Sequence, residues 1–165
     1  MTTTETQITI CNYSNQEHLQ AITALIDAYI KDEMGGGEPL SKPEQLRLVD
    51  GLSSHPKTIV LLAKTDGVFT GLLTAFENFS TFTVKPMINI HDVIVLKEYR
   101  GKGIGRLLMN AIIVEAQNRK CSRITLEVRK DNIAAQSLYK SLGFDETNPG
   151  MFYWRKNCTV NLEPA

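Results

Sequence analysis

One glycine-rich segment constrains the fold of this chain more than any other feature. The segment R-G-K-G-I-G, residues 100–105, follows an alternating apolar run at residues 88–95 and precedes a helical apolar pattern at residues 104–118. The first turn of a helix leaves backbone amides unpaired and favours an anion, and glycines let the anion come close. The segment therefore predicts a strand, a phosphate-binding loop and a helix. A glycine-rich turn with nothing bound is the alternative.

Two common nucleotide-binding motifs do not fit this segment. A P-loop needs G-x-x-x-x-G-K-[ST], which the sequence lacks. A dinucleotide fingerprint needs G-x-G-x-x-G, but Arg106 follows Gly101, Gly103 and Gly105, so the third glycine comes one place early. What remains is the pattern R-x-x-G-x-G, in which Arg100, Lys102 and Arg106 add positive charge.

The apolar periodicity predicts a mixed α/β fold for the whole chain. Strands are predicted at residues 7–13, 58–64, 68–76, 88–95, 123–129 and 151–156, and helices at residues 15–35, 41–52, 104–118 and 132–143. The resulting order is β-α-α-β-β-β-α-β-α-β. It favours a mixed α/β fold with a partly antiparallel sheet, in one domain covering residues 1–165.

Charge and cysteine content exclude several classes of protein. The formal net charge is zero, so bulk attraction to nucleic acid or to an anionic membrane is not expected. The three cysteines form no C-x-x-C pair and no histidines stand at ligand spacing, so we expect neither a disulfide framework nor a metal site. The N-terminal residues lack a signal-peptide pattern and no apolar run reaches membrane-spanning length, which favours a cytoplasmic protein.

Two longer motifs resemble those of a known family. The run V-I-V-L-K-E-Y-R-G-K-G-I-G-R-L-L resembles the acyl-CoA-binding motif of the GNAT superfamily of N-acetyltransferases, and N-I-A-A-Q-S-L-Y-K-S-L-G-F, residues 132–144, resembles its second signature. The two stand at the family's usual separation, and the predicted element order fits as well. The resemblance spans nearly the whole chain. It implies a GNAT fold, with a mixed, mostly antiparallel central sheet and helices on both faces, and acetyl-CoA as the acyl donor.

The resemblance also implies which residues hold the cosubstrate. The pyrophosphate would bind the loop residues, mainly through their backbone amides: Arg100, Gly101, Lys102, Gly103, Ile104, Gly105 and Arg106. The main chain of Val93, Ile94 and Val95 would bond the pantetheine arm like an added strand, while their side chains belong to the core. Asn132 would lie near the cofactor arm, and it can be a helix N-cap at the same time.

Three residues are candidates for the chemistry. Tyr139 occupies the family's tyrosine position and would protonate the leaving thiolate, although a core tyrosine on an amphipathic helix is the alternative. The strand I-N-I-H-D-V-I-V resembles that of the diamine acetyltransferases, where an acidic pair stands at this place; here His91 replaces the residue usually assigned as the base and Asp92 matches the second acid. Strand alternation predicts that these two side chains lie on opposite faces, and hydrogen bonds that fix the strand are the alternative role.

Two segments are candidates for binding the acceptor. Asp32, Glu33 and Glu38 flank a run of three glycines between the first two helices and would attract a cationic amine. The glycines would let this connection move, although a solvated helix end is the plain reading. Phe79 and Phe82, in an aromatic segment resembling that of the diamine acetyltransferases, would wall the pocket, or else belong to the core or a strand edge.

Together these features predict an acetyl-CoA-dependent N-acetyltransferase. The expected acceptor is a small primary amine, a diamine or an amino-acid-like amine, which attacks directly in a ternary complex. An acetyltransferase of peptide or protein amines and a non-catalytic acyl-CoA-binding regulatory module are the alternatives. The expected partners are CoA and the amine, with no nucleic acid and no membrane, and a homodimer is possible.

Overall fold

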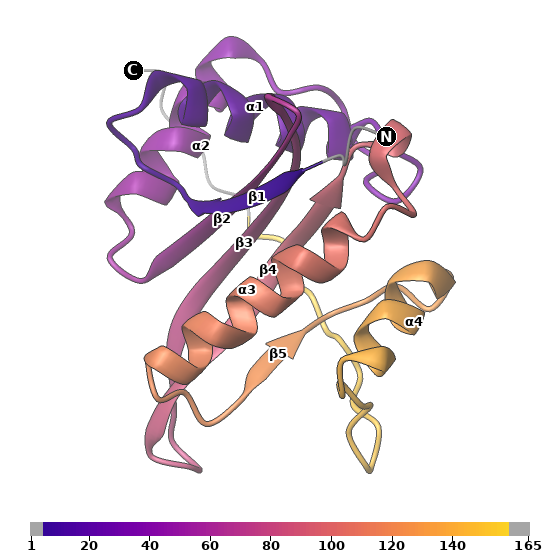
Figure 1. Cartoon of the computed structure of the whole chain (residues 1–165). Helices are drawn as coiled ribbons and strands as arrows, with labels where there is room; N and C mark the ends of the chain where they lie inside the picture. The colour runs from indigo at the N-terminus through magenta and orange to yellow at the C-terminus, as the bar shows by residue number, and fades with distance from the viewer. Residues whose placement is uncertain (1–4, 159–165) are drawn as a thin grey trace. The chain divides into compact units, whose positions relative to one another are not determined.

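The computed structural model describes residues 5–158 of the chain (Figure 1). The chain divides into two compact units, one ending at Asn132 and the other beginning at Ile133, and each is described by itself. Within residues 5–158, no helix is long and apolar enough to cross a membrane.

The first unit is built on a five-stranded sheet in the order β1-β2-β3-β4-β5. The strands are β1 (Thr6–Ile10), β2 (Thr58–Thr65), β3 (Val68–Ser80), β4 (Lys85–Val95) and β5 (Ile124–Leu126). All neighbouring pairs are antiparallel except β4 and β5, which are parallel. The predicted mixed, mostly antiparallel sheet is therefore confirmed.

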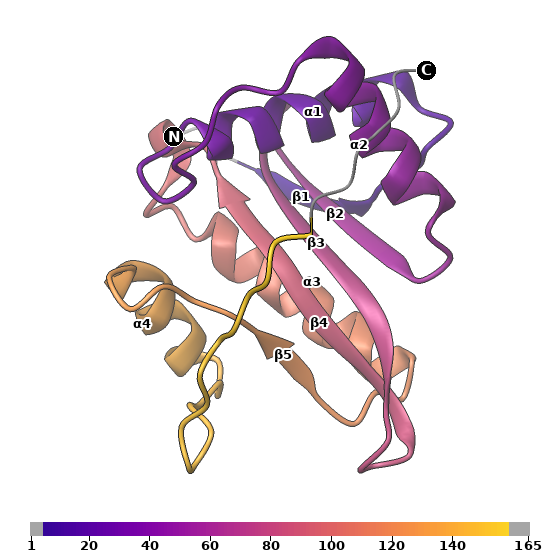
Figure 2. The same ribbon diagram turned by 180° about the vertical axis from the view of Figure 1, so that it is seen from behind.

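Helices cover both faces of this sheet, as predicted. They are α1 (Gln16–Ile30) and α2 (Lys42–Ser54) on one face and α3 (Ile104–Asn118) on the other (Figures 1 and 2). A short 3-10 helix, Lys97–Tyr99, lies between β4 and α3. Each of the first two helices starts at a cap that the sequence supplies: the Asn15 side chain accepts from the Glu17 amide, and Ser41 with Glu44 forms a capping box.

The core follows the alternation of the strands. On the face covered by α1, Leu62, Leu72 and Ile94 are buried against Ile22 and Leu25. This packing sets the face of each residue on β3, because side chains two apart point the same way.

Gly71 fixes how closely α3 approaches the other face. A Cβ at Gly71 would stand 3.2 Å from Leu108 Cδ1 and 3.3 Å from Ile104 Cγ2. The missing side chain lets the first turns of α3 lie directly on β3. It thereby holds the start of α3 beside the end of β4, since Gly71 pairs with Val95.

The second unit contains α4 (Ile133–Ser141), whose end explains the L-G-F motif. The Phe144 amide donates to the Tyr139 carbonyl at 3.1 Å, and the Gly143 amide donates to the Lys140 carbonyl at 3.0 Å. Gly143 has φ 84, so the three features together form a Schellman motif.

The predicted last strand at residues 151–156 is wrong for the structure described here, although the fold class stands. These residues form no strand and their side chains are exposed; Phe152 and Trp154 are each 85% exposed. An alternating segment forms a strand only where a neighbouring strand supplies hydrogen bonds. Within residues 5–158, no strand pairs with this segment.

Candidate active site

The glycine loop, residues 100–106, presents open backbone at the start of α3. Gly101 and Gly103 have φ 73 and φ 83, and a Cβ on either would meet nothing within 4 Å. Gly103 is the N-cap of α3 and provides no side-chain hydrogen bond to the first turn. The first-turn amides of α3 therefore lack a side-chain cap, and positive-φ glycines give a ligand close access to them. This arrangement fits a pyrophosphate.

The charged residues of the loop are not equivalent. Lys102 Nζ lies 4.9 Å from the centroid of the Tyr99 ring, at the exposed rim of the loop. The side chain of Arg100 turns away toward Asp32 and Val95, as set out below. Ile104 is buried in the core and can offer a ligand only its main chain, while Gly105 and Arg106 continue the first turn of α3.

The strand that leads into this loop leaves its neighbour before it ends. The β4–β5 ladder runs from Ile88, opposite Ile124, to Ile90, opposite Leu126, and β5 then stops while β4 continues to Val95. Val93, Ile94 and Val95 therefore have no β5 residue beside them. An extended ligand can add to the edge of β4 there, as a strand would. This edge fits a pantetheine arm.

A β-bulge in β4 changes the expected direction of His91. Asp92 pairs with Thr74 and Ile90 with the next residue, Ala75, so His91 is the extra residue. Asp92 is hydrogen-bonded to Thr74, and the His91 ring contacts Phe76, whose centroid is 5.2 Å away.

Thr74 and Phe76 lie two apart on β3 and share the face of Leu72. The predicted placement of His91 and Asp92 on opposite faces is therefore wrong. Both lie on the face covered by α1 and α2, because the bulge resets the alternation.

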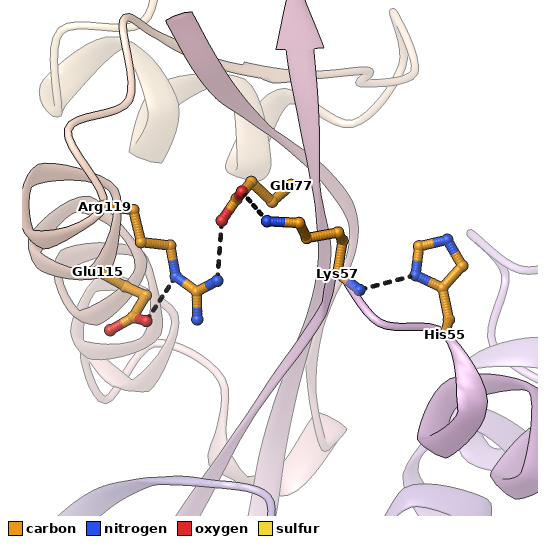
Figure 3. A network of polar contacts seen from close by, with 5 residues as sticks. All are labelled: His55, Lys57, Glu77, Glu115 and Arg119. Carbon is orange, nitrogen blue, oxygen red and sulfur yellow. Dashed lines mark hydrogen bonds and ion pairs between the residues drawn. The ribbon is translucent and has the colours of Figure 1, made fainter.

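The exposed imidazole of His91 belongs to a small aromatic group. Phe76 receives the edge of His91 and also lies edge-on to His55, at a centroid distance of 4.9 Å. His55 is itself oriented, because its Nδ1 accepts the Lys57 amide at 3.3 Å (Figure 3). On its other side, Lys57 binds Glu77, which also binds Arg119 (Figure 3). The group fixes Phe76 as a half-buried aromatic surface beside His91.

Asp92 is half-buried, and its partner is a hydroxyl group. The Thr74 hydroxyl, on a residue only 2% exposed, donates to Asp92 Oδ2. A hydroxyl group orients a carboxylate and brings no opposing charge to it, so the Thr74 contact does not replace a cationic partner.

Tyr29 is a residue of the site that the sequence did not single out. Burial raises the pKa of its phenol, the negative charges of Asp92 and Asp32 raise it further, and Arg129 and Arg100 oppose this. The phenol therefore lies within the electrostatic reach of Asp92, at the end of α1. In the sequence it is one more apolar-face position of an amphipathic helix, and no motif marks it.

The acidic connection between α1 and α2 has unequal members. Asp32 is half-buried and forms an ion pair with Arg100, at 2.8 Å between Oδ2 and Nη2. Glu33 and Glu38 are exposed. Asp32 thus has a cation already, and only Glu33 and Glu38 offer negative charge at the surface of this connection.

Phe79 and Phe82 do not come together with Asp92. They lie toward the β3–β4 hairpin and are 61% and 92% exposed. Phe79 pairs with Pro86, from which Asp92 is separated along β4 by roughly 20 Å at the usual rise per residue. Both side chains are therefore neither core nor close to the carboxylate.

The second signature supplies two further candidates. Asn132 directly precedes α4, which is the position of an N-cap, and its amide donates to the Arg129 carbonyl at 3.0 Å. Tyr139 is half-buried on α4, with its ring centroid 6.1 Å from that of Phe144. This ring contact is the hydrophobic contact that accompanies the Schellman motif, so Tyr139 has a structural role at the end of α4. The roles of both residues toward a substrate stay predictions.

Similarity to known proteins agrees with this geometry. The model of the acetyltransferase (GNAT) family matches residues 22–144. The aminoglycoside N(6')-acetyltransferase type 1 of Salmonella typhimurium is 26% identical over 123 residues, covering 70% of this chain and 83% of that protein. The [ribosomal protein bS18]-alanine N-acetyltransferase of Escherichia coli is 40% identical over 78 residues, covering 45% of this chain and 53% of that protein.

A solved structure extends the likeness to the fold. The crystal structure of a probable acetyltransferase superposes with a TM-score of 0.80 at 22% identity, over 93% of this chain and 99% of that one. The family match covers most of the sequence and includes both motifs. The chain therefore belongs to the acetyltransferase (GNAT) family, and it is an N-acetyltransferase that uses acetyl-CoA as its cosubstrate.

Proposed function

We propose that this enzyme acetylates a small primary amine, either a diamine or an amino-acid-like amine. The observation that carries the proposal is the bulge in β4, which puts an exposed imidazole and a charged carboxylate on one face of the sheet. An amine that binds there as a cation meets Asp92, and His91 is beside it to take a proton. Modification of a peptide or protein amine is the second candidate, favoured by the similarity to an enzyme named for the alanine of a ribosomal protein.

The proposed reaction needs no covalent enzyme intermediate. His91, or Asp92 in its place, removes a proton from the bound ammonium, and the free amine attacks the acetyl carbonyl. The oxyanion that forms accepts a hydrogen bond from a backbone amide of β4. The carbon–sulfur bond then breaks, and Tyr139 donates a proton to the leaving CoA thiolate. The nitrogen of the new amide loses its second proton, which restores the Tyr139 phenol. The products are the acetylated amine and CoA.

The cosubstrate would be held by main-chain groups. The amides of the glycine loop would bind the pyrophosphate, and the unpaired edge of β4 at Val93, Ile94 and Val95 would bond the pantetheine arm. Asn132 would lie near that arm. Glu33 and Glu38 would attract the amine to the site, and Asp32 would act mainly through its partner Arg100. Phe79 and Phe82 have no part in this proposal because of their distance from Asp92.

A thiol-release assay across a panel of acceptors tests the acceptor class. The panel should contain short diamines, amino-acid amides, an aminoglycoside and an alanine-initiated peptide, each at a fixed concentration of acetyl-CoA. We expect the small amines to give the highest kcat/KM. Turnover of the peptide alone would replace the proposal with the second candidate.

The base is tested by variants of the two histidines that contact Phe76. His91→Ala should lower kcat/KM by roughly 100-fold and change the pH dependence of the rate. His55→Ala removes the same kind of ring contact without removing the proposed base, so its pH profile should match the wild type. An unchanged profile in His91→Ala, together with a loss in Asp92→Asn, would assign the base to Asp92.

Tyr139→Phe tests the acid while keeping the packing of the ring. The variant retains the contact with Phe144 and the backbone hydrogen bonds of the Schellman motif, so α4 should remain intact. We expect turnover to fall about 100-fold with CoA affinity nearly unchanged. Wild-type turnover in this variant would leave Tyr139 with only its structural role.

A further inference from the structure

The side chain of Arg100 connects two parts of the molecule that the sequence treats separately. Its Nε donates to the Val95 carbonyl at 3.0 Å, at the end of β4. Its Nη2 donates to Asp32 Oδ2 at 2.8 Å, in the connection between α1 and α2. The residue that begins the glycine loop therefore directs its guanidinium toward the connection between α1 and α2.

Asp32 organises the connection to which Arg100 is bound. Its Oδ1 accepts the Met34 amide at 3.1 Å, and its carbonyl accepts the Gly35 amide at 2.9 Å and the Gly36 amide at 3.0 Å. Its own amide donates to the Tyr29 carbonyl at 3.0 Å. One residue thus shapes the turn that follows Tyr29, so a displacement of Asp32 moves the whole turn.

The connection is packed too tightly to be a loose linker. A Cβ on Gly35 would stand 2.0 Å from the Tyr29 carbonyl oxygen, and one on Gly37 would stand 3.0 Å from Ile30 Cγ2. Arg129, which follows β5, adds a longer contact of 3.5 Å from Nη1 to the Met34 carbonyl. The packing at Gly35 and Gly37 therefore opposes the mobility that the sequence suggested for this connection. They allow the chain to fold back onto the end of α1.

We infer that Arg100 is a positioning residue for the amine acceptor, because it fastens the α1–α2 connection to the end of β4. Through Asp32 it sets the end of α1, where the Tyr29 phenol lies within reach of the charge on Asp92. Through Val95 it holds the strand that leads into the glycine loop. The inference rests on the proposed function for its effect on catalysis, but the Arg100–Asp32 pair itself does not.

The geometry leaves a limited part for Arg100 in binding phosphate. Two of its donating nitrogens are committed to protein partners, and the guanidinium of arginine forms directional hydrogen bonds in a fixed plane. Removing it should therefore affect the acceptor more than CoA. Removing Lys102, whose exposed side chain lies over the Tyr99 ring, should do the reverse.

Steady-state kinetics on the best amine of the panel tests the inference. Arg100→Gln and Asp32→Asn should each raise the KM for the amine roughly five- to tenfold. This is the low end of the usual coupling between two sites of a protein, because the ion pair is partly exposed. The Kd for CoA and kcat should change less than twofold. The double variant should be no worse than either single one, since both remove the same contact. Additive effects, or a larger change in CoA affinity than in amine KM, would overturn the assignment.

Hydrogen exchange supplies a readout that does not require turnover. In Arg100→Gln the amides of Met34 and Gly36 should exchange at least fivefold faster than in the wild type, because their acceptors lie on Asp32. Arg119→Gln is the matched control: it also removes an arginine from ion pairs, with Glu77 and Glu115, and it should leave both amides unchanged.

The two measurements separate the possible failures. Faster exchange in an enzyme that accepts no small amine would keep the Arg100–Asp32 link and reject the proposed acceptor class. Equal exchange in the wild type and Arg100→Gln would reject the link, whatever the enzyme acetylates. If Arg100→Gln does not fold, Asp32→Asn breaks the same ion pair from its other side and gives the same test on the Gly36 amide.

Discussion

The glycine loop before α3 and the connection after α1 each contain three glycines, but their backbones pack in different ways. In the first, Gly101 and Gly103 have positive φ and open space where a Cβ would be. In the second, Gly35 has its Cβ position filled by the Tyr29 carbonyl, and Asp32 binds the turn together. Gly101 and Gly103 leave the backbone open to a ligand, while Gly35 lets the backbone pack against itself. Gly36, at φ 66 with nothing near its Cβ position, is as open as Gly101. The same residue type thus marks either a binding loop or a rigid turn.

Substitution of a loop glycine before α3 should have the largest effect of the changes that test this comparison. Gly103→Val should weaken CoA binding by about 100-fold, because a β-branched residue is strained at this φ and would change the shape of the loop. A factor of this size corresponds to the loss of two charge-assisted hydrogen bonds from loop amides to the pyrophosphate. Calorimetric titration with CoA measures it. Gly67→Val, at φ 84 in the β2–β3 turn with equally open surroundings, imposes the same strain far from the loop in sequence and should bind CoA normally. Equal CoA affinity in both variants would refute the loop assignment.

A smaller effect is expected from the packed connection. Gly35→Ala should lower the free energy of unfolding by about 2 kcal/mol, since the new methyl group overlaps a backbone oxygen that cannot swing away. Chemical denaturation measures it. Gly51→Ala in α2, where the methyl group meets nothing, should not destabilise and serves as the control. If the two alanine variants were equally stable, the connection would be free to rearrange.

The smallest effect concerns the pH dependence of the connection. Its Met34 amide, and then Arg100, lower the pKa of Asp32 below its usual value. A carboxyl whose folded-state pKa is lowered stabilises the fold above its unfolded pKa and loses that contribution as the pH falls through the folded value.

Asp32→Asn should therefore cost about 1 kcal/mol of stability at pH 7, a modest figure because Arg100 is partly exposed. The difference from the wild type should shrink below about pH 4. Thermal unfolding of both proteins between pH 7 and pH 3 measures it. A difference that stays constant over this range would show that Asp32 acts without its charge.

Local signals in the sequence were enough for most of the fold. Helix α3 covers Ile104–Asn118, the predicted range, because the glycine loop fixes its start and an uninterrupted apolar face defines its length. The capping box at Ser41 fixed the start of α2 in the same way. Residues 151–156 failed because a strand depends on a neighbour that alternation cannot supply.

Less of the candidate site than of the fold could be predicted from the sequence. The motifs located the glycine loop and β4, but the bulge at His91 left no mark in I-N-I-H-D-V-I-V, because that run alternates equally well without one. Tyr29 escaped because a helix position facing the core looks the same whether or not charges surround it. The link from Arg100 to Asp32 joins residues far apart in the sequence, and only the fold brings them together.

The extra residue in β4 reverses which residues of that strand face each layer of helices. Ahead of His91, the even-numbered Ile88 and Ile90 share the side of α3, whereas beyond it the even-numbered Asp92 and Ile94 share the side of α1. Pairing the same residues without the bulge would carry Asp92 and Ile94 to the side of α3, whereas deleting His91 itself would leave both on the side of α1 and remove only the second polar side chain there. The bulge therefore decides which helix layer the carboxylate faces, and the extra residue places an imidazole beside it.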